Sequence, residues 1–444
     1  MNKVLPLLMA GCLSAGGFVQ FAHGADLLAV YRDAVAYDAQ YAAARAAVEA
    51  GRERLPQGRA GLLPTIGLTA STAWNDVDST RRLSGATETN IQYNNNGWTV
   101  SLSQPLFRWQ NWVAYTQSEL AVAQAEAQFG LAKQELIVRA AQAYFDVLLA
   151  QDVLATAQTQ KVAIAEQLES AKRNFEVGTA TITDTHEAQA RHDLTSAQEI
   201  AADNDLTVKR QILRSVIGKE PEGLKTLRPG VQLVRPQPDD IGKWVEMAEL
   251  SSGPVQIYQA LYEIATREIG KQRAGHYPTL DLVATRGRSS ASNSTTFGFG
   301  SDSDSSTVGL QLAIPIFAGG GTASKTREAV ALKEKAGADL ENARRTAALN
   351  ARQAFLGVSS GLAQVKAYEA ALTSSQSALD SNKLGYDVGV RINIDVLNAQ
   401  SQLFDTRQKL AKARLDTLAA LLKLKAAAGT LGEDDVAAVN ALLD

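Results

Sequence analysis

The sequence contains little cysteine, few aromatic residues and no long apolar run after its first residues. Only one of its 444 residues is cysteine, Cys12, and 6% are aromatic. A single thiol cannot form an internal disulfide, which excludes a small disulfide-stabilised secreted fold. Beyond the N-terminal segment the sequence offers no stretch of about 18 consecutive apolar residues, which excludes a transmembrane helix. A chain without such a helix can still span a membrane as a closed β-barrel.

A strong charge of either sign is also absent, and histidine is rare. The formal net charge is -3 and the sequence pI is near 6.0, so electrostatics gives no reason to expect a nucleic-acid partner. Two of the four histidines, His186 and His192, are six positions apart, which does not place them together on one helix face as metal ligands. No nucleophile, base and orienting group converge in the sequence, so we expect neither an enzyme nor a bound metal or cofactor.

The N-terminus has the pattern of an export signal. Lys3 precedes an apolar run, and the small residues Ala22 and Gly24 stand at its end, before the expected cleavage site. We therefore predict that residues 1–24 are a signal peptide. In an alternative interpretation, Cys12 and the small residues before it form a lipoprotein processing site, at which Cys12 would carry the lipid.

The two halves of the chain repeat the same order of landmarks, at an offset of 210 to 214 positions. Because the order is preserved, we interpret the chain as one unit duplicated in tandem. We predict a first structural repeat over residues 25–238 and a second over residues 239–444. The matched segments are Arg59–Leu68 with Arg273–Leu282, Gln104–Phe107 with Ile314–Phe317, and Val177-Gly178 with Val388-Gly389.

Each half contains two segments in which apolar residues alternate with small polar residues. This period of two is typical of β-strands, and each run is near the roughly 9 to 11 residues that a tilted strand needs to cross a membrane. A soluble antiparallel sheet with one wet face would show the same alternation. Small hydroxylic residues on the second face and aromatic residues near the ends of the runs favour a membrane barrel. The first face carries Ile66, Leu68, Ala70, Thr72 and Trp74; Trp98, Val100 and Leu102; Leu280, Leu282 and Ala284; and Val308, Leu310, Leu312 and Ile314.

The connections within the two strand pairs are polar. Residues 75–97 and 289–306 are rich in Asn, Ser, Thr, Asp and Gly, so we expect long extracellular loops there. Four strands cannot close a barrel, and an open sheet edge in lipid would leave backbone groups unpaired. We therefore predict an oligomer. A trimer would supply twelve strands, an even number within the range of bacterial barrels.

Long helical patterns follow the strand pairs, over about 108–175 and about 322–384. At 1.5 Å per residue each helix would span on the order of 100 Å, far more than a bilayer. Charges spread along them favour coiled-coil packing. Four prolines between 221 and 238 predict an irregular segment between the halves. Shorter helical patterns cover about 26–59, 183–217, 241–275 and 395–427.

A tight reversal joins each long helix to the shorter helix after it. In each reversal we expect a left-handed glycine that ends the first helix, a side chain that caps the second, and an aspartate in its first turn. An ordinary helical hairpin would explain all of these residues. It would not explain Tyr386 and Arg391, which only the second reversal has. The expected glycine, cap and aspartate are Gly178, Thr181 and Asp184 in the first reversal, and Gly389, Asn393 and Asp395 in the second.

With these features the chain resembles the TolC family of trimeric outer-membrane efflux and type I secretion channels. The most specific segments are Tyr386–Leu397 and the strand exit Gln104–Phe107, and the resemblance covers essentially the whole mature chain. It implies a mainly α fold with a membrane β-barrel, in which three chains contribute four strands each to a twelve-stranded barrel. A twelve-helix α-barrel of coiled coils would continue this barrel through the periplasm, closed at rest by the second hairpin.

The resemblance also implies roles for residues of the tips. Asp395 would form a three-fold carboxylate ring at the periplasmic constriction, while Asn398 stands where the family has a second acidic residue. Three carboxylates instead of six should bind cations more weakly, so we expect block by cations at Asp395 but no resident metal. Tyr386 and Arg391 would be latch residues, with Thr183 and Asp184 on the partner hairpin as acceptors. The hairpin tips, on which an adaptor would dock, are Gly178, Thr179, Gly389 and Val390.

The implied function is a channel in the outer membrane of a Gram-negative bacterium, extending into the periplasm, that exports proteins or small toxic compounds. The implied partners are two further copies of the chain, a periplasmic adaptor, an inner-membrane transporter of the ABC or RND type, and outer-membrane lipid. Two other functions compete. A trimeric coiled-coil surface adhesin would place its barrel at one chain end and need no duplication. A porin open at rest would need no helices long enough to cross the periplasm.

Overall fold

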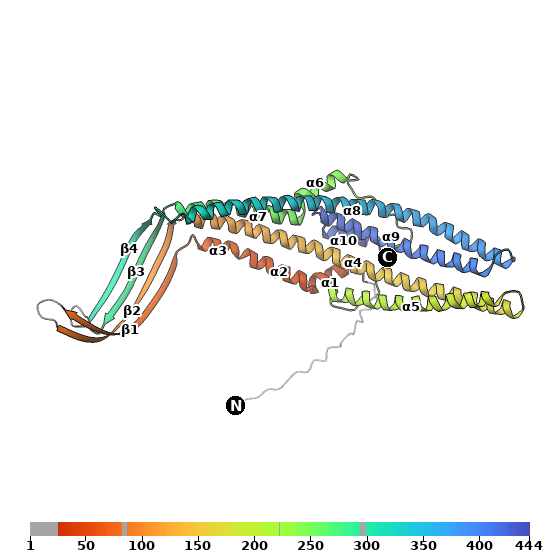
Figure 1. Ribbon diagram of the computed structural model, residues 1–444, viewed down its shortest axis with the longest axis horizontal. Coiled ribbons are helices and arrows are strands. Elements are labelled where there is room, and N and C mark those ends of the chain that lie inside the picture. Colours follow the sequence, from red (N-terminus) through yellow and green to blue (C-terminus); the bar gives the residue numbers. More distant parts are fainter. Residues whose placement is uncertain (1–24, 82–86, 222, 294–298) are drawn as a thin grey trace, which may run out of the picture.

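The computed structural model describes residues 25–81, 87–221, 223–293 and 299–444. This part of the chain is a long rod, with four strands at one end and two helical hairpins at the other (Figure 1). The predicted signal peptide, residues 1–24, lies outside the described residues together with Cys12.

Within the described ranges, no helix has both the length and the apolar character needed to cross a membrane.

The four strands form one antiparallel sheet in the order β1-β2-β3-β4. Residues opposite each other in an antiparallel pair share a face. Ile66 lies opposite Leu102, and Leu282 opposite Leu310, which confirms the predicted apolar face. In the single chain this face is open, since Ile66 is 71% exposed and Leu310 is 66% exposed. The strands are β1 (Thr65–Arg81), β2 (Thr87–Phe107), β3 (Thr279–Ala291) and β4 (Ser301–Ala313).

The centre of the sheet joins the two halves of the chain. β2 from the first half pairs with β3 from the second, with Trp98 opposite Arg288 and Leu102 opposite Ala284. In the part of the chain that the structure describes, β1 and β4 each have a neighbour on one side only. The sheet therefore presents two edges with unpaired backbone donors and acceptors.

The predicted loop over residues 75–97 is wrong, because most of it is strand. β1 and β2 stay paired as far as Arg81 opposite Thr87. Asparagine and aspartate commonly favour turns, but here they hydrogen-bond across the hairpin, as where Asn90 donates to Asp76 at 2.9 Å. These cross-strand bonds replace the local turn bonds that the composition predicted.

The predicted loop over residues 289–306 is also too long. β3 continues to Ala291 and β4 already begins at Ser301. The last residue of β3 lies opposite Asn95, so the paired β1–β2 hairpin extends beyond β3 and β4 at this end of the sheet.

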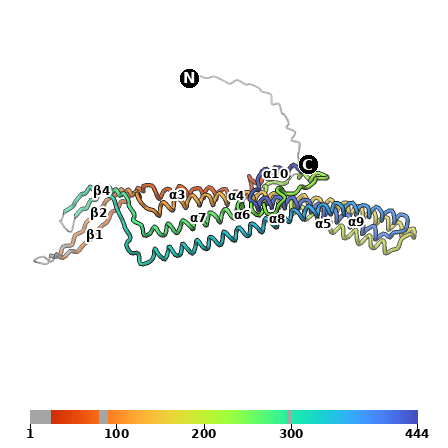
Figure 2. Tube along the Cα trace, turned by 90° about the horizontal axis from the view of Figure 1, so that it is seen from above, coloured from red at the N-terminus to blue at the C-terminus, as the bar shows by residue number. Residues whose placement is uncertain are grey.

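The two long helices confirm the prediction. α4 (Trp109–Glu176) has 68 residues and α8 (Gly321–Asp387) has 67, so each is about 100 Å long. A shorter helix folds back along each of them, α5 (Ile182–Ile217) along α4 and α9 (Asn393–Ala427) along α8. Figures 1 and 2 show the resulting two hairpins side by side at the end of the rod opposite the sheet.

Two stretches that the sequence predicts as single helices, 26–59 and 241–275, are interrupted. Asp38 leaves helical geometry, with φ -60° and ψ 120°, and its side chain caps the helix that follows. The second stretch breaks at Ser252, just before Pro254, which has no backbone donor for a continuing helix. The helices that result are α1 (Leu27–Tyr37), α2 (Ala39–Arg52), α3 (Arg54–Ala60), α6 (Ile241–Ser251) and α7 (Gly253–Arg273).

A buried core lies in the middle of the rod. There α4, α5 and α9 pack with α1 and with a short C-terminal helix, α10 (Glu433–Asn440), which the sequence did not predict. Tyr144 is fully buried in this core and donates its hydroxyl to the Lys225 carbonyl at 2.7 Å. The stretch 221–238, irregular as predicted where it is described, forms an isolated bridge between Leu227 and Leu443.

Candidate gate at the helical tips

The two tips share one backbone turn. Gly178 has φ of 78° and Gly389 has φ of 79°, the left-handed conformation that the sequence predicted for both. In the first tip the carbonyl of residue 174 accepts from the amide of Thr179 at 2.8 Å, and in the second the carbonyl of residue 385 accepts from the amide of Val390 at 2.8 Å. Because these backbones match, any functional difference between the tips resides in their side chains.

The side chains that begin α5 and α9 differ. Thr181 caps α5 as predicted, and the Asp184 carboxylate accepts from the Thr181 amide at 2.9 Å in return. Asn393 was predicted to cap α9, and that prediction is wrong. Ile392 occupies the cap position, and Asn393 is already in the first turn, where it is 1% exposed. Its side chain points into the protein because it has hydrogen-bond partners on the first hairpin.

Both tips present apolar side chains to solvent. Val390 is 78% exposed, beside the left-handed glycine of the second tip. Thr179 is exposed in the first tip, with its hydroxyl on the carbonyl of residue 174 at 3.0 Å. The residues predicted for adaptor docking are therefore accessible in the single chain. The exposed apolar residues of the tips are Val177 and Ile182, and Val388, Val390 and Ile392.

The predicted latch residues have different partners within one chain. The Tyr386 hydroxyl accepts from Asn174 at 3.0 Å, which links α8 to the end of α4. The Arg391 guanidinium lies 3.6 Å from the Asp395 carboxylate on its own hairpin. The single chain thus does not bring Arg391 to Asp184, whose carboxylate is engaged at the start of α5.

The two predicted constriction residues have partners on different hairpins. The Asp395 side chain is 35% exposed and faces Arg391. Asn398, further along α9, accepts at its Oδ1 from Arg191 of α5 at 2.8 Å. Asn398 therefore connects the two hairpins. Sequence reasoning did not single out Arg191, because this contact joins residues 207 positions apart.

A second pair of side chains connects the hairpins. Gln167 of α4 donates to Asn393 Oδ1 at 2.5 Å, and Asn393 Nδ2 lies 3.4 Å from the carbonyl of Asp184. The sequence does carry one signal for this contact. At the repeat offset of 211, Asn393 corresponds to Ile182, so a polar residue stands where the other repeat has an apolar one.

Beyond these contacts a polar groove of about 490 Å³ runs along α5 and α9. Arg191, Asp205 and Asp405 contribute charged side chains to its lining. Across the described ranges, no group of three or more His, Cys, Asp or Glu residues is placed to hold a metal ion.

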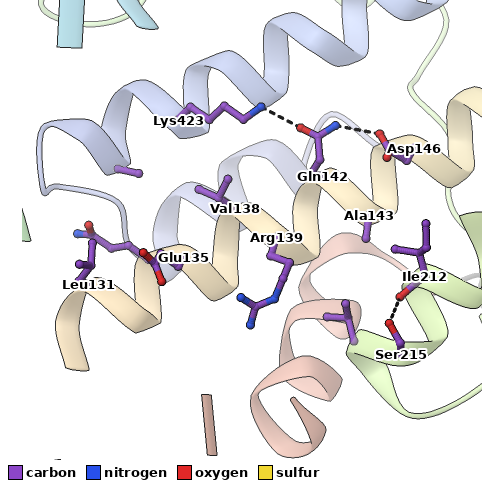
Figure 3. Close-up of a pocket in the computed structure, with 13 residues that line it drawn as sticks. Leu131, Glu135, Val138, Arg139, Gln142, Ala143, Asp146, Ile212, Ser215 and Lys423 are labelled. Carbon is purple, nitrogen blue, oxygen red and sulfur yellow. Dashed lines mark hydrogen bonds between the residues drawn. The ribbon is translucent and has the colours of Figure 1, made fainter. Parts of the chain in front are cut away.

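Another groove, of about 600 Å³, lies nearer the middle of the rod between α4, the end of α5 and α9 (Figure 3). Val138 and Ile212 are among its apolar residues. Gln142 accepts from Lys423 at 3.0 Å and donates to Asp146 at 2.9 Å along one side. None of the predicted gate residues lines this groove, so it is distinct from the tips.

Comparisons with known proteins agree on one family. A sequence profile of the family described as "Outer membrane efflux protein" matches residues 30–219 and 244–430. The outer membrane protein TolC of Vibrio cholerae is 34% identical over 442 residues, which cover 99% of this chain and 98% of that protein. The alkaline protease secretion protein AprF of Pseudomonas aeruginosa is 33% identical over 420 residues, covering 94% and 86%. Among solved structures, the CmeC outer membrane channel of Campylobacter jejuni has a similar fold, with a TM-score of 0.79 at 16% identity over 100% of this chain and 98% of that chain.

Proposed function

The chain belongs to the outer membrane efflux protein family, and we propose that three copies of it form an export duct with a gate at the periplasmic tips. It is an outer-membrane channel protein of the kind that serves efflux and type I secretion, and it extends into the periplasm. The family is one of transport proteins, not of enzymes.

The four-stranded sheet is the main support for this proposal. It has one apolar face that is open in the single chain and two edges whose backbone groups need partners. In a membrane these edges must pair, because no water is present to satisfy them. Pairing β1 of one chain with β4 of the next closes the sheet, and three chains of four strands give a twelve-stranded barrel. Its apolar face would then meet outer-membrane lipid.

The helices continue the barrel as a tunnel. We assign two strands and two tunnel helices to each repeat, 25–238 and 239–444, so that three chains provide twelve helices. α4 and α8, at about 100 Å each, are long enough to carry the duct well away from the membrane. An open porin has no use for helices of this length.

The gate is assigned to the second hairpin. Asp395 would form the carboxylate ring of the constriction, with Asn398 one turn deeper. The Arg391 side chain is 59% exposed, so its guanidinium can leave Asp395 for Thr183 or Asp184 of a neighbouring subunit. Tyr386 would hold the same hairpin through its hydroxyl. Such polar contacts are individually modest, which suits a latch that must open.

The exposed tips suit a docking partner. Exposed apolar residues gather at the tips, among them Val177 and Val390 beside Gly178 and Gly389, and such a grouping marks a surface that a partner can cover. As an export component the chain works with partner proteins. We propose that a periplasmic adaptor covers the tips and couples the duct to an inner-membrane transporter of the ABC or RND type. The cargo would be proteins, as the name of AprF indicates for that relative, or small toxic compounds.

Conductance of the purified protein in planar bilayers tests the proposal. A gated duct has a low resting conductance, whereas an open porin conducts fully without mutation. An adhesin would form no channel that depends on residues of the tips. A large steady conductance of the unmutated protein would contradict the proposed gate.

A further inference from the structure

The groove of about 600 Å³ between α4, the end of α5 and α9 supports an inference that rests on the proposed export duct. We propose that this groove, the wall groove, opens into the bore of the duct and binds small apolar organic cations, with the positive group of the ligand at Glu135. It lies near the middle of α4, about 60 Å along this helix from the tips. The site is therefore separate from the gate.

The wall groove lies on the side of α4 that the rest of the chain leaves uncovered. Tyr144 points to the other side, where its hydroxyl donates to the Lys225 carbonyl in the core with α1 and α10. Gln142 and Asp146 line the groove, and each is two positions from Tyr144, about 200° around an α-helix. The core and the groove therefore lie on opposite sides of α4.

The orientation of α9 agrees with this. Lys425 pairs with Asp435 of α10. Lys423, two positions away, instead donates to Gln142 in the groove at 3.0 Å. α10 lies on one side of the rod, as Figure 2 shows. In a tunnel of twelve helices such an added layer must lie outside, because inside it would obstruct the bore. The groove on the opposite side then faces the bore.

The floor of the wall groove is apolar. Val216 is buried and Val138 is partly buried, while Ile212 is 45% exposed, so the side chains of the single chain do not fill the groove. Its volume lies within the range of sites that hold a drug-sized organic molecule. The apolar body of such a molecule would leave water on binding there, which is favourable. The apolar lining residues are Leu131, Val138, Ala143, Ile212, Val216 and Ala426.

Most charged residues that line the groove are engaged with groups of its walls. Arg139 donates to Asp38 at 2.8 Å, and Asp146 lies 3.3 Å from Lys209. In these two pairs the opposite charges balance. Lys423 is held at one end of the groove by its hydrogen bond to the amide of α4 (Figure 3).

Glu135 supplies the charge that selects the ligand. Its side chain is exposed, and within the described ranges it takes part in no ion pair. It lies seven positions, about 10 Å, along α4 from the residue that holds Lys423, so water and salt screen most of the repulsion between Lys423 and a bound cation. A free carboxylate beside an apolar floor is complementary to an organic cation. At the repeat offsets of 210 and 211, Glu135 corresponds to Arg345 and Thr346, so the second half has no acid there and each chain has one site.

Binding of ethidium, an aromatic cation with a permanent charge, to the purified trimer tests the wall groove. Fluorescence anisotropy should give three sites per trimer, whereas a carboxylate ring on the three-fold axis would hold one. Glu135→Gln should weaken binding about 2- to 5-fold, as the loss of a partly exposed ion pair implies, and should remove most of the salt dependence of the affinity. Glu119→Gln, which removes an exposed carboxylate of α4 outside the groove, is the matched control and should keep the affinity.

Two further measurements test the floor and the bore. Ile212→Ala should weaken ethidium binding about 5-fold, because it removes apolar contact area. In the channel opened by Arg391→Ala, ethidium should lower the conductance in planar bilayers, and adding Glu135→Gln should weaken this block. A block that does not depend on Glu135 would overturn the placement of the groove in the bore.

The outcomes separate the wall groove from the proposed function. A trimer that binds no ethidium would overturn the groove, because a neighbouring copy would then fill it. Equal affinity in Glu135→Gln and the unmutated protein would overturn it as well. A high resting conductance of the unmutated protein would instead overturn the gated duct and leave Glu135-dependent binding in place. Should Ile212→Ala fail to assemble, Glu135→Gln decides, since it changes an exposed side chain and should leave the thermal midpoint of the trimer unchanged.

Discussion

At the scale of single residues, the backbone conformation of the tips could be predicted from the sequence, whereas the long-range contacts of their side chains could not. Gly178, Gly389 and Thr181 were predicted correctly because a left-handed residue and a cap depend only on neighbours in the chain. Asn393 is a residue type that often caps helices. In the structure its side chain points inward instead, because it accepts a hydrogen bond from Gln167, 226 positions away. A tertiary contact of this kind has no local signal, apart from the mismatch between the repeats.

Asp395 carries the first prediction. If three copies of its carboxylate ring the constriction, multivalent cations added to one side of a planar bilayer should block the channel. Asp395→Ala should weaken this block by at least about 10-fold, because the three negative charges are lost together. Asp387→Ala, which removes an exposed carboxylate from the end of α8 in the same hairpin, is the control and should keep the block. Equal block in the Asp395 variant would contradict the assignment.

At the scale of elements, the lengths of α4 and α8 followed from uninterrupted helical patterns, whereas the breaks in shorter helices did not. Asp38 ends a helix because its side chain caps the next one and also accepts from Arg139 of α4 at 2.8 Å. The β1–β2 hairpin is longer than predicted because polar side chains pair across it. In both cases partners distant in sequence override the preference of the local composition.

Glu268 gives a prediction about the contact between α7 and α4. Burial acts to raise the pKa of Glu268, but hydrogen bonds from Gln117 and Gln272 and the charge of Lys271 outweigh it, so the pKa lies below its ordinary value. A depressed pKa means that the unfolded chain binds the proton more readily, so this stabilisation is present above about pH 4.5 and is lost as pH falls through the folded pKa. Glu268→Gln should therefore destabilise the protein at pH 7, on the order of 1 kcal/mol.

Thermal unfolding in detergent at pH 7 and near pH 4 checks this. The difference between the unmutated protein and the Glu268 variant should shrink at the lower pH. Glu249→Gln, at an exposed position on α6, should show no such trend. A difference that stays constant with pH would mean that the charge of Glu268 does not hold α7 to α4.

At the scale of the whole molecule, the four-stranded sheet is unfinished in one chain. Its open apolar face can meet lipid, but its two edges are stable in a membrane only when strands of neighbouring copies pair with them. Native mass spectrometry from detergent should therefore give three chains, and weakening the edge of β4 by Gln311→Pro should shift the protein toward single chains. A monomer that still forms channels would contradict the twelve-stranded barrel.

The duplication makes the two halves alike in the barrel and the tunnel, but their tips differ. At the offset of 211, Tyr386 corresponds to Phe175 and Arg391 to Ala180, while the backbone turns are the same. The central claim is that the gate resides in this difference. Gating should therefore depend on these side chains and not on the backbone turn, which both tips share.

Resting conductance in planar bilayers tests this claim most directly. Tyr386→Phe combined with Arg391→Ala gives the second tip the residues of the first at both positions and should raise resting conductance at least about 10-fold, as the loss of two hydrogen-bonding groups implies. The reciprocal variant, Phe175→Tyr with Ala180→Arg, should remain as closed as the unmutated protein. Unchanged conductance in the first variant, or an equal rise in both, would contradict a gate carried by the second tip.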